Sequence, residues 1–121
     1  MRTFYRVART CPPGNDDYTT ASERRGGAPP PPYVPPERHR SWYDGLSAYD
    51  TIAVARACAI RNRGKLGSWI VRYDIPEGRG ITWELFPGDE EDGHYDLFGD
   101  REELKSYQDP GSCFKVEIPS R

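Results

Sequence analysis

The residues of this sequence that could do chemistry are few, and they lie at the ends of predicted elements. His94 follows Gly93 at the start of a predicted strand and is the histidine best placed for acid–base work near neutral pH. Arg6 lies inside the first predicted strand, where burial of a guanidinium is costly without an anion or carboxylate partner. Ser47 and Tyr49 come just before a predicted helix, where side chains and amides can point at a ligand. Each of the four also has an ordinary structural explanation, as a solvent-facing arginine, a turn serine, a core tyrosine or a structural histidine.

The motifs that mark common enzymes and metal sites are absent from the sequence. It contains no GxxxxGK[ST] phosphate loop, no GxGxxG, no HExxH and no GxSxG. Cys11, Cys58 and Cys113 are widely spaced without a CxxC pair, and His39 and His94 lie far apart, so we expect no metal site. We interpret all three cysteines as free thiols in a reducing compartment.

Alternating and aromatic residues bounded by Gly and Pro predict the strands that must position these groups. The predicted strands cover residues 3–9, 46–49, 68–75, 81–86, 94–98 and 113–118.

Two helices and one long loop complete the expected elements. A helix is predicted over residues 51–62 with Asp50 at its N-cap, and a short helix over 101–108 with Asp100 as its cap. Residues 14–41 include PPPPYVPP, which predicts a long ordered loop with polyproline II character. The order predicts an α+β fold, with a mixed or antiparallel sheet, one main helix and a short second helix on one face or edge.

The chain has 121 residues, so we expect a single domain over 1–121 that carries the Pro-rich loop at 14–41. The N-terminus has no apolar run typical of a secretion signal, and no segment is apolar enough to span a membrane. We therefore expect a cytoplasmic protein without a membrane partner.

The charges are nearly balanced but unevenly placed. The formal net charge is −2, from 17 basic and 19 acidic residues, which argues against tight nonspecific binding to a polyanion. A local anion site stays open, and so does nucleic-acid binding as a weaker alternative, because arginines crowd the first third of the chain: Arg2, Arg6, Arg9, Arg24, Arg25, Arg38 and Arg40.

Four segments, taken in order, resemble the ADP-ribosyltransferase superfamily: FYRVART, DGLSAYDTIAVARA, SWIVRYDIP and GHYDLFGDREEL. Arg6 matches the anchoring His or Arg of the family's first strand, and Ser47 or Tyr49 falls in its second motif. The third motif is usually a Glu near a late strand, and His94 stands there instead. The resemblance spans residues 3–107. It is closer to small uncharacterised bacterial proteins that share a YRV…GLS-Y-T…GHY-L-GD pattern.

The resemblance implies a compact ADP-ribosyltransferase-like fold with NAD as the substrate. Arg6 would hold the ribose or pyrophosphate, Ser47 the sugar and Tyr49 the nicotinamide, with His94 as the acid–base group. The implied reaction is transfer of ADP-ribose to a macromolecule or cleavage of NAD, and a role as a bacterial toxin, a phage-conflict effector or a metabolic enzyme stays open. The missing glutamate would be replaced only if the fold brought over Glu84, Glu102 or Glu103.

A non-enzymatic protein-interaction module on the same fold is the alternative. Tyr33, Trp42 and Tyr43 lie in or beside the Pro-rich segment, and residues 29–43 would form the contact with a protein partner. A pocket that lacks convergent polar groups beside an aromatic surface patch would favour this hypothesis.

Overall fold

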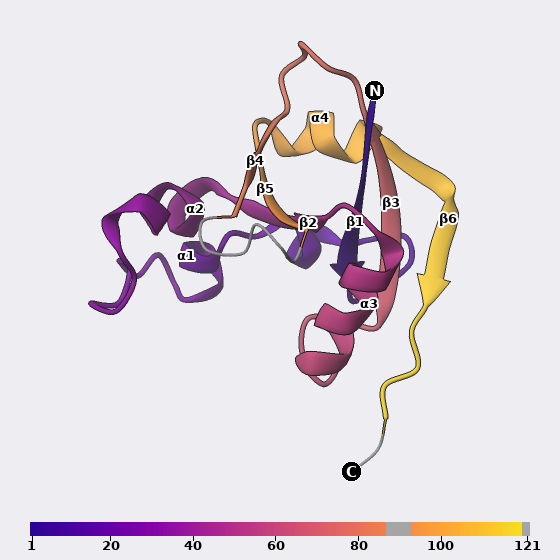
Figure 1. The fold of residues 1–121 in the computed structure, drawn as a ribbon, viewed down its shortest axis with the longest axis horizontal. Helices are drawn as coiled ribbons and strands as arrows, with labels where there is room; N and C mark the ends of the chain where they lie inside the picture. The colour runs from indigo at the N-terminus through magenta and orange to yellow at the C-terminus, as the bar shows by residue number, and fades with distance from the viewer. Residues whose placement is uncertain (87–92, 120–121) are drawn as a thin grey trace.

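Figure 1 shows the computed structural model of the chain, which describes residues 1–86 and 93–119. Within these residues, six strands form one antiparallel sheet in the order β4-β5-β2-β1-β3-β6. The predicted α+β class with an antiparallel sheet is confirmed. The strands are β1 (Arg2–Ala8), β2 (Leu46–Tyr49), β3 (Trp69–Ile75), β4 (Thr82–Leu85), β5 (His94–Phe98) and β6 (Gln108–Lys115).

The sheet consists of two halves that meet along a short seam. β1 pairs with β3 along its whole length, from Arg2 opposite Ile75 to Ala8 opposite Trp69. On its other edge β1 pairs with β2 at Tyr5↔Tyr49 alone. We call β1, β3 and β6 the β3 half, and β4, β5 and β2 the β2 half. The seam between them is where β1 and β2 separate.

Two helices cover opposite faces of the sheet. α3 (Ile52–Arg61) packs its Ala55 into a buried cluster with Ile70, whereas α4 (Arg101–Ser106) packs its Leu104 into a cluster with Val71. Neighbouring strand residues point to opposite faces, so these clusters lie on opposite sides of the sheet. The prediction that both helices share one face or edge is wrong, although α3 and α4 confirm the main and the short helix.

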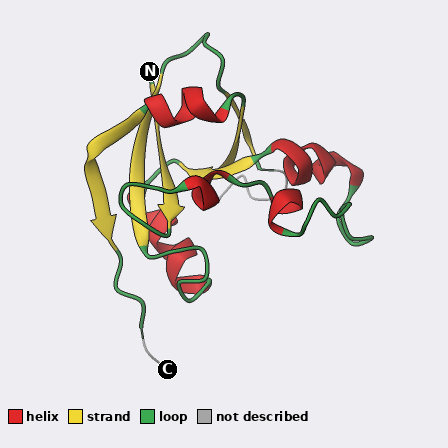
Figure 2. Ribbon diagram, turned by 180° about the vertical axis from the view of Figure 1, so that it is seen from behind, coloured by secondary structure: helices red, strands yellow, loops and turns green. Residues whose placement is uncertain are grey.

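Residues 14–45, which we call the lobe, connect β1 to β2; Tyr18 packs into the core beside Tyr73, and the part of the lobe from residue 21 onward projects from one side of the sheet (Figures 1 and 2). The lobe contains four short helices, so the prediction of a loop over 14–41 is wrong in part. Thr20 and Glu23 form a capping box that starts one of them, a sequence signal that the proline content outweighed in the prediction. The helices are η1 (Asn15–Tyr18), α1 (Ala21–Arg24), η2 (Pro36–Arg38) and α2 (His39–Asp44).

Three predicted elements differ from the structure in a cap or a boundary: α3, α4 and β6. Thr51 rather than Asp50 caps α3, because the Asp50 amide donates to Gly93 O and continues the sheet. β6 spans Gln108–Lys115, with Gln108 opposite Tyr73, so it begins and ends earlier than the predicted strand over 113–118, and α4 ends at Ser106 rather than at residue 108. The other predicted strands agree with the structure to within one residue, and Asp100 caps α4 as predicted, accepting from Glu103 N.

Cys11 and Cys113 form a disulfide, so the prediction of three free thiols is wrong; only Cys58, which is buried, is free. The two partners are 102 residues apart in the sequence. They meet because Cys11 follows β1 and Cys113 lies in β6, and β3 pairs with both strands. In the part of the chain that the structure describes, no helix has the length and apolar character needed to cross a bilayer.

Candidate functional site

Two adjoining hollows lie between the lobe and the sheet. The larger has a volume of about 260 Å³ and is lined by residues of the lobe, β2 and β5, including Ser47, His94 and Asp96. The smaller, of about 50 Å³, opens at the seam, where Arg6 and Tyr49 line it. Ser47 lines both hollows, so they form one candidate site.

His94 is held between two aromatic rings at the edge of the larger hollow. The Phe86 ring is parallel to the imidazole at a centroid distance of 4.2 Å, and the Tyr49 ring stacks at 4.9 Å. Phe86 follows β4 and Tyr49 ends β2, and β5 lies between these strands. The two rings therefore flank the imidazole, and its edge rather than its face is what the hollow offers to a ligand.

Ser47 connects the predicted site residues. Its Oγ lies 3.2 Å from His94 Nε2, in a hydrogen bond whose direction depends on the imidazole tautomer. Its carbonyl oxygen accepts a hydrogen bond from Arg6 Nε at 2.7 Å. The Ser47 side chain is exposed, so its hydroxyl is within reach of a bound molecule.

Arg6 fills the seam of the sheet. Its guanidinium also donates through Nη1 to Asp17 O at 2.8 Å, and the residue is only 7% exposed. Two backbone carbonyls, rather than a carboxylate, thus satisfy this buried cation, and one of them belongs to the lobe. Arg6 has a structural task at the seam in addition to any contact with a ligand.

Tyr49 is buried, and its ring stacks against the His94 imidazole. Its hydroxyl lies 2.8 Å from Cys58 Sγ in a hydrogen bond, and burial together with the neighbouring thiol raises the pKa of Tyr49 far above its ordinary value. The phenol stays neutral at physiological pH, and one face of its ring lies against His94. The structure brings all four predicted residues together, and it places the Tyr49 hydroxyl away from proton transfer.

Asp96 is a site residue that the sequence analysis missed. It lies two residues after His94 on β5, opposite Ser47, so both face the same side of the sheet. Asp96 is 3% exposed, and burial raises the pKa of its carboxyl while a hydrogen bond from Ser41 opposes that rise. A Cβ on Gly45 would stand 2.8 Å from Asp96 Oδ1, so the glycine makes room for the carboxylate. The alternation of His94, Tyr95 and Asp96 was the signal that could have found it.

The three glutamates considered for the missing carboxylate are engaged elsewhere. Glu84 is exposed and forms an ion pair with Arg40 at 2.7 Å. Glu103 accepts hydrogen bonds from Gly80 N and the Tyr107 hydroxyl, and Glu102 pairs with Lys105. None of them lines either hollow.

Basic side chains surround the site. Arg6, Arg9 and Arg24 line the smaller hollow, and burial and the neighbouring guanidiniums lower the pKa of Arg24. In the larger hollow the Arg38 guanidinium lies 4.8 Å from the centre of the Phe86 ring. The site therefore combines cations with aromatic surface, which suits an anionic ligand that carries a flat ring.

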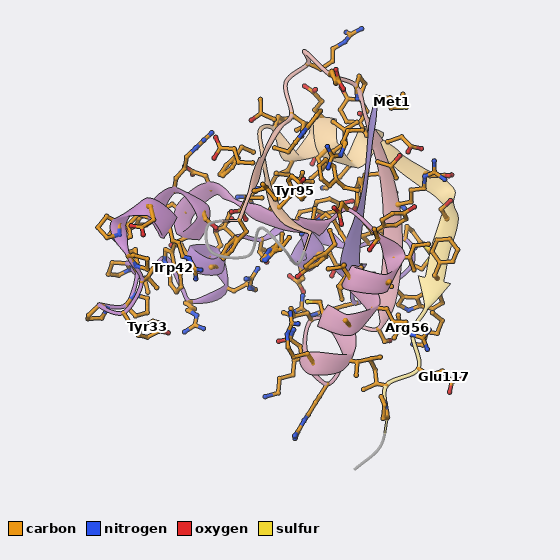
Figure 3. All side chains as sticks on the ribbon, in the orientation of Figure 1. Met1, Tyr33, Trp42, Arg56, Tyr95 and Glu117 are labelled. Carbon is orange, nitrogen blue, oxygen red and sulfur yellow. A yellow bond between two sulfur atoms is a disulfide. The ribbon has the colours of Figure 1, made fainter. Side chains whose placement is uncertain are left out.

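The aromatic residues of the lobe differ in how far they are covered, and Tyr43 is 45% exposed. Tyr33 is 78% exposed, but Trp42 donates Nε1–H to Ala28 O and lies beneath the Arg25 guanidinium. Figure 3 shows Tyr33 and Trp42 both on the lobe, away from the β3 half. The described residues contain no cluster of His, Cys, Asp and Glu able to hold a metal ion.

Comparison of the chain with known protein families, with curated proteins and with solved structures finds no match.

Proposed function

We propose that the chain binds NAD between the lobe and the β2 half, on an ADP-ribosyltransferase-like fold, and transfers ADP-ribose to a macromolecule or cleaves NAD. The observation that carries the proposal is the meeting of His94, Ser47 and Asp96 in one hollow. Convergent polar groups in a hollow that also presents aromatic surface are typical of small-molecule sites.

The chemistry of the lining residues fits NAD. Guanidinium groups suit a pyrophosphate, and the Val34 and Trp42 side chains offer apolar surface for a flat base, whereas the Phe86 ring already contacts His94 and Arg38. The hollow of about 260 Å³ is smaller than ligand pockets usually are, so it would take one end of the dinucleotide. The smaller hollow adjoins it at Arg24 and Ser47 and would receive the anionic part.

Asp96, His94 and Ser47 would each have a separate role in the proposed reaction. When the bond from ribose C1′ to the nicotinamide nitrogen breaks, the electron pair stays on nicotinamide and positive charge develops on the ribose. The buried Asp96 carboxylate would stabilise that charge, as carboxylates do in glycoside cleavage. The attacking water or acceptor hydroxyl would give its proton to His94, while Ser47 holds the imidazole in place.

Nicotinamide release from NAD tests the proposal. We expect His94→Ala to lower turnover by ~100- to 10,000-fold, because a positioned acid–base group contributes that much. His39→Ala is the matched control, since His39 lies in the lobe and lines neither hollow. Equal turnover in the wild type and in His94→Ala would contradict the role of His94, and an absence of turnover and of NAD binding in the wild type would contradict the proposal itself.

A protein-interaction module is the second candidate, supported by the exposed Tyr33 at the end of PPPP. The residues 29–43 would then form the contact, and Tyr33→Ser would weaken binding of the partner without changing NAD turnover. A cytoplasmic location also stays a proposal. The Cys11–Cys113 disulfide weighs against it, because disulfides are typical of oxidising compartments.

A further inference from the structure

We propose that Arg24 is the residue that binds the ligand's anionic group at the junction of the two hollows, so that a diphosphate binds more tightly than a monophosphate. This inference rests on the proposed nucleotide site and adds a binding residue to it. Neither the candidate motifs nor the resemblance included Arg24.

The position of Arg24 is the first argument. Arg24 ends α1 and lines both the smaller and the larger hollow, a property that it shares only with Ser47 among the described lining residues. Its Nη1 donates to Thr19 O at 2.7 Å, which holds the guanidinium at the junction. A cation fixed between two hollows is placed to bind a group that joins two parts of one ligand.

The charge balance of the smaller hollow is the second argument. Three guanidiniums line it, those of Arg6, Arg9 and Arg24, together with the carboxylates of Asp16 and Asp17. The Asp17 carboxylate is largely occupied, because it accepts from the amides of Arg9 and Gly14 and lies 3.7 Å from Arg9 Nη1. Arg24 has no ion pair of its own among the contacts of the described residues, and its guanidinium feels the like charge of its neighbours. An anion in the hollow would relieve that repulsion.

The size of the smaller hollow is the third argument. Its volume of about 50 Å³ exceeds the ~30 Å³ that one water occupies in the liquid and leaves room for little more than one compact group. One phosphate is such a group, and a nucleoside or a second ring is too large. A ligand that uses both hollows therefore places its terminal phosphate here, against Arg24, and its flat ring in the larger hollow.

Calorimetric titration of the full chain with ADP and with AMP tests the role of Arg24. In the wild type we expect ADP to bind at least ~10-fold more tightly than AMP, since a charge-assisted hydrogen bond has that effect. Arg24→Gln is expected to remove the difference by weakening ADP alone. Arg25→Gln is the matched control, because Arg25 is the next residue, covers Trp42 and lines neither hollow. Thermal unfolding of both variants checks that each is folded.

The outcomes separate this inference from the proposed function. If Arg24→Gln keeps the preference for ADP, or if the wild type has none, Arg24 does not have this role, whether or not NAD is cleaved. If the preference exists and is lost in Arg24→Gln while no NAD is cleaved, the inference stands and the proposed reaction fails. If neither nucleotide binds the wild type, the inference is overturned.

Discussion

The two halves of the sheet meet at a seam whose pairing is much less complete than the pairing inside the β3 half. In the β3 half, β1 and β3 pair along seven residues, with Val71, Tyr73 and Ile75 buried on one face and Ile70 on the other. Across the seam, β1 and β2 pair at one position, and a guanidinium fills the opening.

The difference separates the scaffold from the site. Along the β1–β3 ladder the backbone groups of the two strands bond one another and the side chains of Val71, Tyr73 and Ile75 are buried, so this ladder contributes stability rather than chemistry. Where the ladder opens, carbonyls and side chains of β2 and β5 meet the lobe, and three buried polar residues line the hollows there: Arg6, Asp17 and Asp96.

Loss of the Cys11–Cys113 disulfide should weaken the β3 half. Because the bridge closes a loop across most of the chain, we expect reduction to lower the free energy of unfolding by about 2–4 kcal/mol. Urea unfolding with and without reductant measures the change. The double variant Cys11→Ser/Cys113→Ser is the control, since reductant should not affect it. An unchanged midpoint for the reduced wild type would show that the bridge contributes nothing.

Removal of the Arg6 guanidinium should open the seam. Arg6→Met keeps most of the aliphatic stem but leaves the carbonyls of Ser47 and Asp17 without their charged donor, at a cost of about 2–3 kcal/mol of folding stability. Arg56→Met on the exposed side of α3 should change stability by less than about 0.5 kcal/mol. If both variants unfold at the same denaturant concentration, Arg6 does not join the halves.

Neutralisation of Asp96 should lower NAD turnover and raise the free energy of unfolding at pH 7. Burial raises the pKa of Asp96 in the folded state, so the folded chain holds this proton more tightly and stability falls as pH rises from the unfolded pKa through the folded one. Asp96→Asn should therefore be more stable than the wild type at pH 7, by an amount that disappears below about pH 3.9. Its NAD turnover should fall. Lower stability at pH 7, measured by urea unfolding, would mean that the carboxylate is a structural group.

The ion pair of Arg101 with Glu23 joins α4 to the lobe and should have the smallest effect. Hydrogen bonds from Arg101 lower the pKa of Glu23 to about 2, so its contribution is complete above the unfolded pKa and is lost as pH falls through about 2. Both side chains are 41% exposed, so Glu23→Gln should cost less than about 1 kcal/mol at neutral pH. A pH-independent difference between the variant and the wild type would assign the effect to the Thr20 cap instead.

The sequence predicted the local elements well because local patterns determine them. Alternation located β1, β3 and β5, and the apolar spacing of residues 51–62 located α3. Contacts that depend on strand order were missed, because neither the stacking of Phe86 on His94 nor the Cys11–Cys113 bridge follows from spacing in the chain. The meeting of Arg6 and His94 at Ser47 was expected only through the resemblance.

Two features that the sequence analysis missed, α1 and Asp96, do have signals in the sequence. The Thr20–Glu23 capping box marked α1, and with it the position of Arg24, within a segment whose prolines favoured a loop. Asp96 shares a strand face with His94, and period-two alternation is enough to place them together. Its burial depends on Ser41 and Gly45 from the lobe, which no local pattern predicts.

A crystal structure of the chain soaked with NAD would show whether the ligand site lies between the lobe and the β2 half. We expect density for the ligand against Ser47 and the edge of His94, with a phosphate beside Arg24. Density on the β3 half, or a fully bound ligand that touches neither Ser47 nor His94, would contradict it.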